Sequence, residues 1–422
     1  MQIHTLEELR SGKLKGRRTL KISQGLTTFP LEVLELADSL EVLDLSNNKL
    51  SSIPKEISKL TKLKIAFFSY NEFTTFPTVF KELKNLYMLG LKGNQIEQFE
   101  EDILPLSISW LILTDNRLTS LPDSMGKLTK LQKFPLAGNR LSELPRSMQN
   151  CQKLELLRLS ANNFKEIPQW LLELPKLAWL AFSGNPCSVS KATKMKIVEY
   201  KDIEMDELLG EGASGKIYRA NIKTVDYPVA IKLFKGSVTS DGYAEDEMNA
   251  YMSIGEHPNL INVLARLENK HLGLVLEYIA PRFKNLGNPP NFETCSRDTY
   301  TEELAFDVQE IEKVANAIIS ASKHLHSRGL MHGDLYAHNI LVDGIYDSYL
   351  VDFGAASFYD KENRLYEKLE VLAFGNLLDD MLTRCSSTDS QLYKTLDELR
   401  SRCRVSDVSK RPLFSEIEKG LL

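Results

Sequence analysis

Three glycines near the middle of the chain have the spacing of a loop that can wrap around phosphate groups. Gly210, Gly212 and Gly215 form a Gly-x-Gly-x-x-Gly pattern, and backbone N–H groups can approach a phosphate where no side chain intervenes. Dinucleotide-binding proteins share this spacing, but they continue into a helix with an acidic residue about 20 positions later. Here residues 217–222 alternate as a strand does, and Val229–Lys232 predicts a second strand. The pattern therefore favours a glycine hairpin followed by a strand that carries a lysine.

This order of elements resembles the protein kinase superfamily, and the resemblance covers residues 201–422. It implies that Lys232 holds the α- and β-phosphates of ATP. It also implies that Glu247, on the next expected helix, pairs with that lysine. Glu245 is the nearby alternative, but a shift of two residues points to a different face of the helix.

The same resemblance assigns a catalytic loop to residues 332–341, where Asp334 would accept or orient the proton of the substrate hydroxyl. Asn339 and Asp352, the latter followed by phenylalanine and glycine, would coordinate Mg²⁺, which prefers hard oxygen ligands. The implied catalytic set is thus Lys232, Glu247, Asp334, Asn339 and Asp352. The implied ATP contacts are Leu209, Gly210, Glu211, Gly212, Ser214, Gly215, Ile217, Ala230, Lys232, Glu277, Ile279 and Leu341.

Several positions depart from the family pattern. Gly333 replaces the arginine usually found before Asp334, which suggests activity without phosphorylation of the activation loop. Tyr336 replaces the lysine typical of Ser/Thr kinases, so this position does not indicate which hydroxyl is phosphorylated. Serine/threonine specificity is expected only because it is the commoner type among protein kinases. No Ala-Pro-Glu segment follows Asp352. Arg411 resembles the family's arginine that pairs with the glutamate of that segment, so the sequence leaves the partner of Arg411 open.

These departures keep two alternatives open. Small-molecule kinases of the aminoglycoside and choline type also carry His-Gly-Asp and lack the Ala-Pro-Glu segment, although they usually lack the glycine triad and the Val-Ala-Ile-Lys strand. The other alternative is a catalytically inactive scaffold with a kinase fold. The main expectation is a protein kinase that transfers the γ-phosphoryl group of Mg-ATP to a protein hydroxyl.

The first half of the chain repeats itself with a period of about 23 residues. The repeated unit resembles the L-x-x-L-x-L-x-x-N-x-L pattern of leucine-rich repeats, over residues 19–187. Its leucines would point into a solenoid, and each asparagine amide would bond backbone groups left unpaired at a turn. The asparagines that align are Asn48, Asn71, Asn94, Asn116, Asn139, Asn162 and Asn185. A proline ladder follows the same period, with Glu100 in place of one proline.

The concave face of the predicted solenoid has two outward rows, at six and at four residues before each asparagine, and the first row is apolar in six of its seven positions. Apolar surface of this extent tends to mark an interaction site. We therefore expect a protein-binding groove, or alternatively a face covered by the second half of the chain itself. The candidate partner-binding residues are Ile65, Phe67, Met88, Trp110, Ile112, Leu156 and Trp179.

Composition sets broad limits. The 52 basic and 57 acidic side chains among 422 residues give a net charge of −5, which does not favour nucleic-acid binding. Five dispersed cysteines fit reduced thiols and a cytoplasmic location better than a disulfide framework. The first residues do not resemble a signal peptide, and no apolar run is long enough for a membrane span.

The expected architecture is an α/β leucine-rich-repeat solenoid followed by an α+β bilobal domain similar to protein kinases. The whole resembles leucine-rich-repeat protein kinases of bacterial type. The expected boundaries are an N-terminal cap at 1–18, repeats at 19–187, a linker at 188–200 and a kinase domain at 201–422, divided into lobes at 201–279 and 280–422.

Overall fold

The computed structural model describes residues 1–421 except 190–193, 213, 236–237, 240 and 269. The chain forms two compact units, Met1–Lys165 and Glu166–Leu422. Part of the predicted linker, residues 190–193, lies outside the described residues. Within the described part, no helix combines the length and the apolar character that crossing a bilayer requires.

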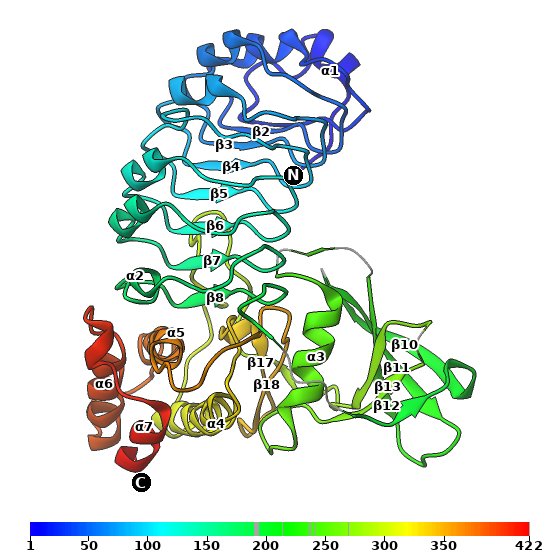
Figure 1. Ribbon diagram of the computed structural model, residues 1–422, viewed down its shortest axis with the longest axis vertical. Helices are drawn as coiled ribbons and strands as arrows, with labels where there is room; N and C mark the ends of the chain where they lie inside the picture. The colour runs from blue at the N-terminus through cyan, green and yellow to red at the C-terminus, as the bar shows by residue number, and fades with distance from the viewer. Residues whose placement is uncertain (190–193, 213, 236–237, 240, 269, 422) are drawn as a thin grey trace. The chain divides into compact units, whose positions relative to one another are not determined.

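The first unit is a coil of short parallel strands, one for each repeat (Figure 1). Strands β1 to β6 each pair with the next one, and residues at equal positions in the repeat face each other, as Val42 faces Ile65. The strands are β1 (Thr19–Lys21), β2 (Val42–Asp44), β3 (Ile65–Phe67), β4 (Met88–Gly90), β5 (Trp110–Ile112), β6 (Lys133–Pro135) and β7 (Leu156–Arg158). Helix α1 (Leu6–Arg10) precedes them and begins with a capping box between Thr5 and Glu8.

The asparagine ladder bonds one repeat to the next. Asn71 donates from Nδ2 to the carbonyls of Leu45 and Phe68, at 2.9 and 3.1 Å, and accepts the N–H of Leu50 at 2.9 Å. Asn94 and Asn116 make the same three kinds of bond. The predicted structural role of these amides is thereby confirmed.

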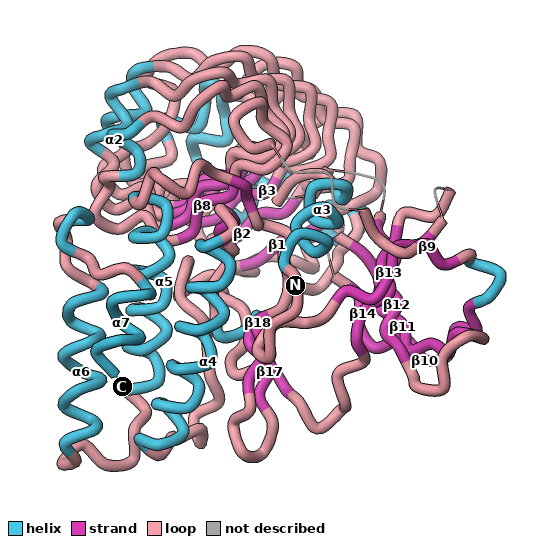
Figure 2. The backbone as a smooth tube through the Cα atoms, turned by 60° about the horizontal axis from the view of Figure 1, so that its bottom comes forward, coloured by secondary structure: helices cyan, strands magenta, loops and turns pink. Residues whose placement is uncertain are grey.

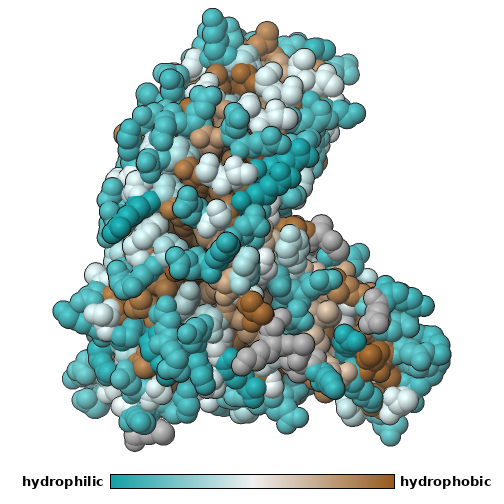
Figure 3. Space-filling view, viewed as in Figure 1, coloured by the Kyte–Doolittle hydropathy of each residue, from teal (hydrophilic) through white to brown (hydrophobic). Residues whose placement is uncertain are grey.

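The proline ladder marks the other side of the coil, where a proline precedes each 3₁₀ helix because its fixed φ suits the first helical turn. These helices are η1 (Leu31–Leu36), η2 (Lys55–Lys59), η3 (Thr78–Glu82), η4 (Asp123–Lys127) and η5 (Arg146–Asn150). Hydrophilic side chains cover most of the visible surface of the repeats (Figure 3).

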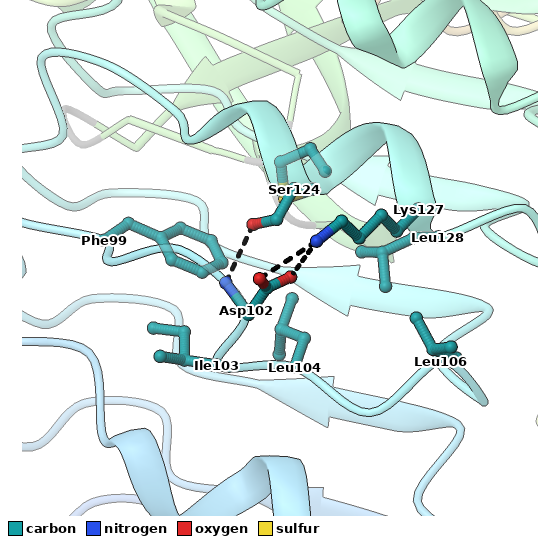
Figure 4. A pocket seen from close by; sticks show the side chains of 9 residues that line it. Phe99, Asp102, Ile103, Leu104, Leu106, Ser124, Lys127 and Leu128 are labelled. Carbon is teal, nitrogen blue, oxygen red and sulfur yellow. Dashed lines mark hydrogen bonds and ion pairs between the residues drawn. The ribbon is translucent and has the colours of Figure 1, made fainter.

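In the repeat with Glu100 in place of proline, Asp102 bonds Ser124 and Lys127 of the next repeat (Figure 4). Asp102 adopts a φ of 56°, and its carboxylate lies 2.7 Å from the Lys127 ammonium. The Glu101 carboxylate accepts the N–H groups of Asp123 and Ser124, at 2.9 and 2.7 Å, at the start of η4. The cavity beside them has a volume of about 10 Å³, which is room for a single water molecule.

The second unit begins with a turn of leucine-rich-repeat sequence, α2 (Gln169–Leu172) and β8 (Trp179–Ala181), and β8 lies against α5 (Leu365–Leu382) (Figure 1). The predicted boundary between repeats and kinase-like domain therefore differs from the division into compact units, which falls after Lys165. Residues 166–188 group with the second unit because they bond its loops and helices, as described below.

A six-stranded sheet in the order β10-β11-β12-β14-β13-β9 forms the first lobe. Its strands are β9 (Ile197–Val198), β10 (Ile203–Glu211), β11 (Gly215–Ile222), β12 (Val229–Phe234), β13 (Val263–Leu267) and β14 (Gly273–Glu277). Alternate apolar residues of these strands, among them Ile231 and Val275, form a buried cluster. Helix α3 (Ala244–Ile254) follows β12 in the chain.

The second lobe is mainly helical, and its long helices run side by side in Figure 2. Helix α4 (Val308–Ser327) contacts both α5 and α7 (Phe414–Leu421), while α6 (Gln391–Cys403) contacts α5. Short strands lie between the helices and the first lobe: β15 (Lys284–Asn285), β16 (Leu330–Met331), β17 (Ile340–Val342), β18 (Ser348–Leu350) and β19 (Ser357–Phe358). The loops beside β16, β17 and β18 carry three of the predicted catalytic residues, Asp334, Asn339 and Asp352.

Candidate active site

The glycine loop is the turn between β10 and β11. Gly212 donates its N–H to the carbonyl of Gly215 at 2.9 Å, which closes the turn. A Cβ on Gly215 would lie 2.3 Å from the carbonyl oxygen of Leu233, so this position requires glycine. A Cβ on Gly210 or Gly212 would meet no atom within 4 Å, so the space beside these two glycines is open.

A buried ion pair joins the sheet to helix α3. The Lys232 ammonium on β12 hydrogen-bonds the carboxylate of Glu247, and the two residues are only 4% and 2% exposed. Glu245 is exposed to solvent, so the structure places Glu247 against Lys232. Burial alone would lower the pKa of Lys232, but Tyr251, Glu247 and Asp352 outweigh it and raise this pKa, which keeps the ammonium charged.

The loop between β16 and β17 holds Asp334 and Asn339. Asn339 donates from Nδ2 to the carbonyl and to the carboxylate of Asp334, both at 2.9 Å. The His332 ring fixes this loop. Its Nδ1 accepts the N–H of Asp334 at 3.2 Å, and its Nε2 lies 2.9 Å from the carbonyl oxygen of Val351. Asp334 and Asn339 thus bond each other within the loop, and His332 ties the loop to the segment that precedes Asp352.

Asp352, Phe353 and Gly354 connect this loop to helix α3. The buried ring of Phe353 packs between Tyr251 of α3 and His332, with ring centroids 5.0 and 4.9 Å apart. Asp352 is exposed and adopts a φ of 60°, and its Oδ1 accepts the N–H of Gly354 at 3.2 Å. Burial of Phe353 therefore fixes Asp352 next to it while the carboxylate stays open to solvent.

The donor set fits a divalent cation bound together with phosphates. The Asn339 amide nitrogen is engaged with Asp334, which leaves the amide oxygen to face a cation, and Asp352 offers an exposed carboxylate. Among the described residues no group of three or more His, Cys, Asp or Glu side chains forms a metal cage. A cation at these two side chains would therefore need ligand oxygens to complete its coordination.

The other residues expected at the ATP site lie around the glycine loop and β14. Ala230 is buried on β12 and pairs with Leu276, next to Glu277. The Glu277 carboxylate accepts the Asn262 amide at 2.8 Å. The remaining positions are partly or fully exposed: Leu209, Glu211, Ser214, Ile217, Ile279 and Leu341.

None of the residues predicted for the concave groove is fully exposed. Ile65, Met88 and Leu156 are buried, whereas Phe67, Trp110 and Ile112 are half-buried. Trp179 is 2% exposed, and its ring stacks on Tyr336 with centroids 4.3 Å apart. Trp179 is thus engaged within its own compact unit and is not presented to another molecule.

Sequence reasoning missed a group of residues that hold the catalytic loop from outside. Asp298 accepts the His338 N–H at 3.0 Å and lies 2.7 Å from His338 Nδ1. The buried Glu370 of α5 accepts the N–H of Gly333 at 2.5 Å. Nothing in the spacing of Asp298 indicates its contact with His338. The glycine at position 333 did indicate an unusual backbone there, because the observed φ of 74° favours glycine.

Comparisons with known proteins agree with this geometry. The model of the protein kinase domain matches residues 203–374, and the model of the leucine-rich repeat matches residues 38–96 and 107–164. The chain therefore consists of an N-terminal leucine-rich-repeat region followed by a protein kinase domain. Such a domain implies ATP and a divalent metal ion.

Several curated kinases are similar over this second region. The serine/threonine-protein kinases AtPK2/AtPK19 and AtPK1/AtPK6 of Arabidopsis thaliana are each 30% identical, over 43% and 40% of this chain. Cyclin-dependent kinase 11.1 of Caenorhabditis elegans is 28% identical over 43% of the chain. The matches span 38%, 34% and 25% of the length of these three relatives.

Among solved structures, a leucine-rich-repeat protein of Leptospira interrogans is 29% identical, with a TM-score of 0.38. This similarity covers 42% of this chain and 46% of that protein.

Proposed function

We propose that the chain is an active protein kinase that transfers the γ-phosphoryl group of Mg-ATP to a serine or threonine hydroxyl of a protein. The observation that carries the proposal is the presence of two pairs in one compact unit: Asn339 bonds Asp334, and a charged, buried Lys232 bonds Glu247. The similarity to serine/threonine kinases favours these hydroxyls over tyrosine. An inactive scaffold would not need this complete set.

Each residue has a distinct task in the proposed reaction. Lys232, oriented by Glu247, holds the α- and β-phosphates so that the γ-phosphate lies in line with the incoming hydroxyl. Asp334 orients that hydroxyl and takes up its proton. Asn339 and Asp352 hold Mg²⁺, which neutralises charge that develops on the phosphates. The chain supplies positioning and electrostatic stabilisation, since phosphoryl transfer needs little covalent help.

We further propose that the repeats are the protein-interaction or regulatory module and that the protein works in the cytoplasm, as a kinase of the bacterial leucine-rich-repeat type. All five cysteines are free thiols, which suits a reducing compartment. The partner-binding surface would involve the half-buried Phe67, Trp110 and Ile112.

The deciding experiment is incubation of the purified chain with radiolabelled ATP and Mg²⁺, for the native chain and for Asp334→Asn. We expect label on protein and a loss of about 10²- to 10⁴-fold in rate for the variant, with its fold intact. Asp389→Asn removes an exposed carboxylate elsewhere in the same unit and serves as the matched control.

Two outcomes would overturn the proposal. Label transferred to an added small alcohol and never to protein would indicate a small-molecule kinase. Tight binding of Mg-ATP without any transfer would indicate an inactive scaffold.

A further inference from the structure

We propose that the last leucine-rich repeat, residues 175–188, positions the catalytic loop, and that Trp179 is the central residue of this contact. The inference rests on the proposed kinase function. It goes beyond that function by assigning to the end of a repeat region a task inside the active site. Four contacts, all within the second compact unit, support it.

The first contact is between Trp179 and the two residues that follow Asp334. The indole Nε1–H donates to the carbonyl of Leu335 at 3.0 Å, and the ring stacks on Tyr336 at an interplanar angle of 8°. Both Leu335 and Tyr336 are buried. One side chain of the repeat therefore fixes a backbone group and a side chain directly beside the catalytic aspartate.

The second contact explains the glycine that precedes Asp334. A Cβ on Gly333 would lie 2.7 Å from the carbonyl oxygen of Leu180 and 2.5 Å from that of Ala355. No side chain fits between these two backbones, and the φ of 74° disfavours one as well. An arginine at this position would thus prevent the repeat from approaching the catalytic loop.

The third contact holds the short activation segment, residues 355–369, which lies between Gly354 and Glu370. The N–H of Phe182 donates to Ser357 Oγ at 2.8 Å, and the N–H of Phe358 donates to Ser188 Oγ at 3.0 Å. The Phe182 ring lies 5.3 Å from the ring of Tyr366. Ser357 is fully buried, so its hydroxyl has the role of a backbone anchor.

The fourth contact answers the question of the partner of Arg411. Its buried guanidinium donates to three carbonyls, of Val405 at 3.0 Å, Lys368 at 3.2 Å and Pro175 at 2.6 Å. Burial lowers the pKa of Arg411 to about 10. The carbonyl of Pro175 in the repeat thus supplies one of the acceptors for Arg411, in place of the glutamate of the missing Ala-Pro-Glu segment.

Together these contacts bring the repeat to the points where the chain departs from the kinase pattern. Gly333 and Tyr336 meet β8 directly, and the short activation segment and Arg411 bond the residues on either side of it. Because Trp179 covers Tyr336, a protein substrate must approach Asp334 without contacting that side chain. We infer that residues 175–188 replace a phosphorylated activation segment as the support of the catalytic loop.

The test compares steady-state kinetics of the full-length chain with Trp179→Ala, Trp179→Phe and Trp170→Ala. We expect Trp179→Ala to lower kcat by about 10²-fold, because a small misplacement of a catalytic group has an effect of that order. KM for ATP should change less than twofold, since Trp179 bonds Leu335 and stacks on Tyr336, whereas Lys232 bonds Glu247 of helix α3. Trp179→Phe keeps the stack and loses the N–H donor, so a decrease of about two- to tenfold is expected.

Trp170 is the matched control, because this half-buried indole lies on α2 in the same repeat region. Trp170→Ala should lower the melting temperature without lowering kcat. Hydrogen exchange of peptides from residues 330–342 provides a readout that needs no activity, and Trp179→Ala should accelerate it.

An unchanged kcat in Trp179→Ala, with unchanged exchange, would overturn the inference while leaving the kinase function standing. A raised kcat would also overturn it, because it would mean that the repeat blocks the site. Absence of activity in the native chain would instead contradict the proposed function, and the exchange experiment would still test the contact.

Discussion

Trp110 and Trp179 stand at the same position of two leucine-rich repeats, yet they have different neighbours. Trp110 is half-buried, and the ammonium of Lys133, from the same position of the next repeat, lies 4.2 Å from its ring centroid. Trp179 is buried on Tyr336 and bonds the carbonyl of Leu335. One sequence pattern thus serves two purposes. Inside the first unit a repeat position packs against the neighbouring repeat, whereas in the second unit it packs against a catalytic loop.

The largest contrast is expected for two glycines with nearly equal backbone angles. Gly333 and Gly25 have φ values of 74° and 70°, but a Cβ on Gly25 would meet no atom within 4 Å. Gly25→Ala should cost only the strain of a left-handed residue, about 1–2 kcal/mol. Gly333→Ala adds the clash with Leu180 and Ala355, so we expect a loss of about 2–5 kcal/mol and of most kinase activity.

Denaturant unfolding and kinase assays of both variants would measure this contrast. Equal losses of stability for Gly333→Ala and Gly25→Ala would contradict the close approach of the repeat to the catalytic loop.

The next contrast concerns two asparagines of the ladder. Asn94→Ala leaves the N–H of Phe73 buried without its acceptor, whereas the carbonyls of Phe68 and Leu91 lose one donor but keep Asn71 and Asn116. The first unit should therefore be destabilised by about 1–3 kcal/mol. Because each repeat contacts its neighbours, the effect should remain local, and kcat should not change. Asn185 donates to the carbonyls of Phe182 and Ser183, at 2.9 and 3.4 Å.

Since Phe182 anchors Ser357, Asn185→Ala should lower kcat as well as stability. Differential scanning calorimetry combined with kinetics separates the two variants. A decrease of kcat in Asn94→Ala as large as that in Asn185→Ala would show that the ladder has one role throughout.

The smallest contrast is in the response to pH. Burial lowers the pKa of His338, but Asp298, Asp334 and Asp352 outweigh it and raise this pKa above its ordinary value. Because the pKa of His338 is higher in the folded chain, protonated His338 contributes its full stabilisation at pH values below the pKa of the unfolded chain. This stabilisation is lost as the pH rises through the pKa of the folded chain. The melting temperature of the second unit should therefore decrease by a few degrees above neutral pH.

In the first unit, stability depends on pH with the opposite sign. Hydrogen bonds from Lys64 and Arg18 lower the pKa of the half-buried Glu41 carboxyl, so its contribution to stability is present above the unfolded pKa and is lost in acid. His338→Gln should remove the decrease in the melting temperature of the second unit above neutral pH. A dependence that persists in this variant would assign it to another group.

Much of the molecule could be predicted from the sequence because its signals are local. The period of the asparagines predicted the repeats. Motif spacing predicted that Lys232 meets Glu247 and that Asp334 and Asn339 share one loop, and both pairs join residues close together in the chain. The contacts of Trp179, Asp298 and Arg411 join residues far apart in the chain. No periodicity encodes such contacts. The sequence therefore left open whether Trp179 lies in a binding groove or is covered by the second half of the chain, and it did not indicate the residues that cover it.

The bonds of Arg411 and Trp179 also bear on how such a chain can be rearranged. Because Pro175 and Leu180 are built into the second unit, the smallest portable module begins near Glu166 and not at the first residue of the glycine hairpin. Because each repeat of a solenoid contacts mainly its neighbours, we expect the chain to tolerate a change in the number of repeats before Lys165 better than the loss of the last repeat, which is part of the second unit.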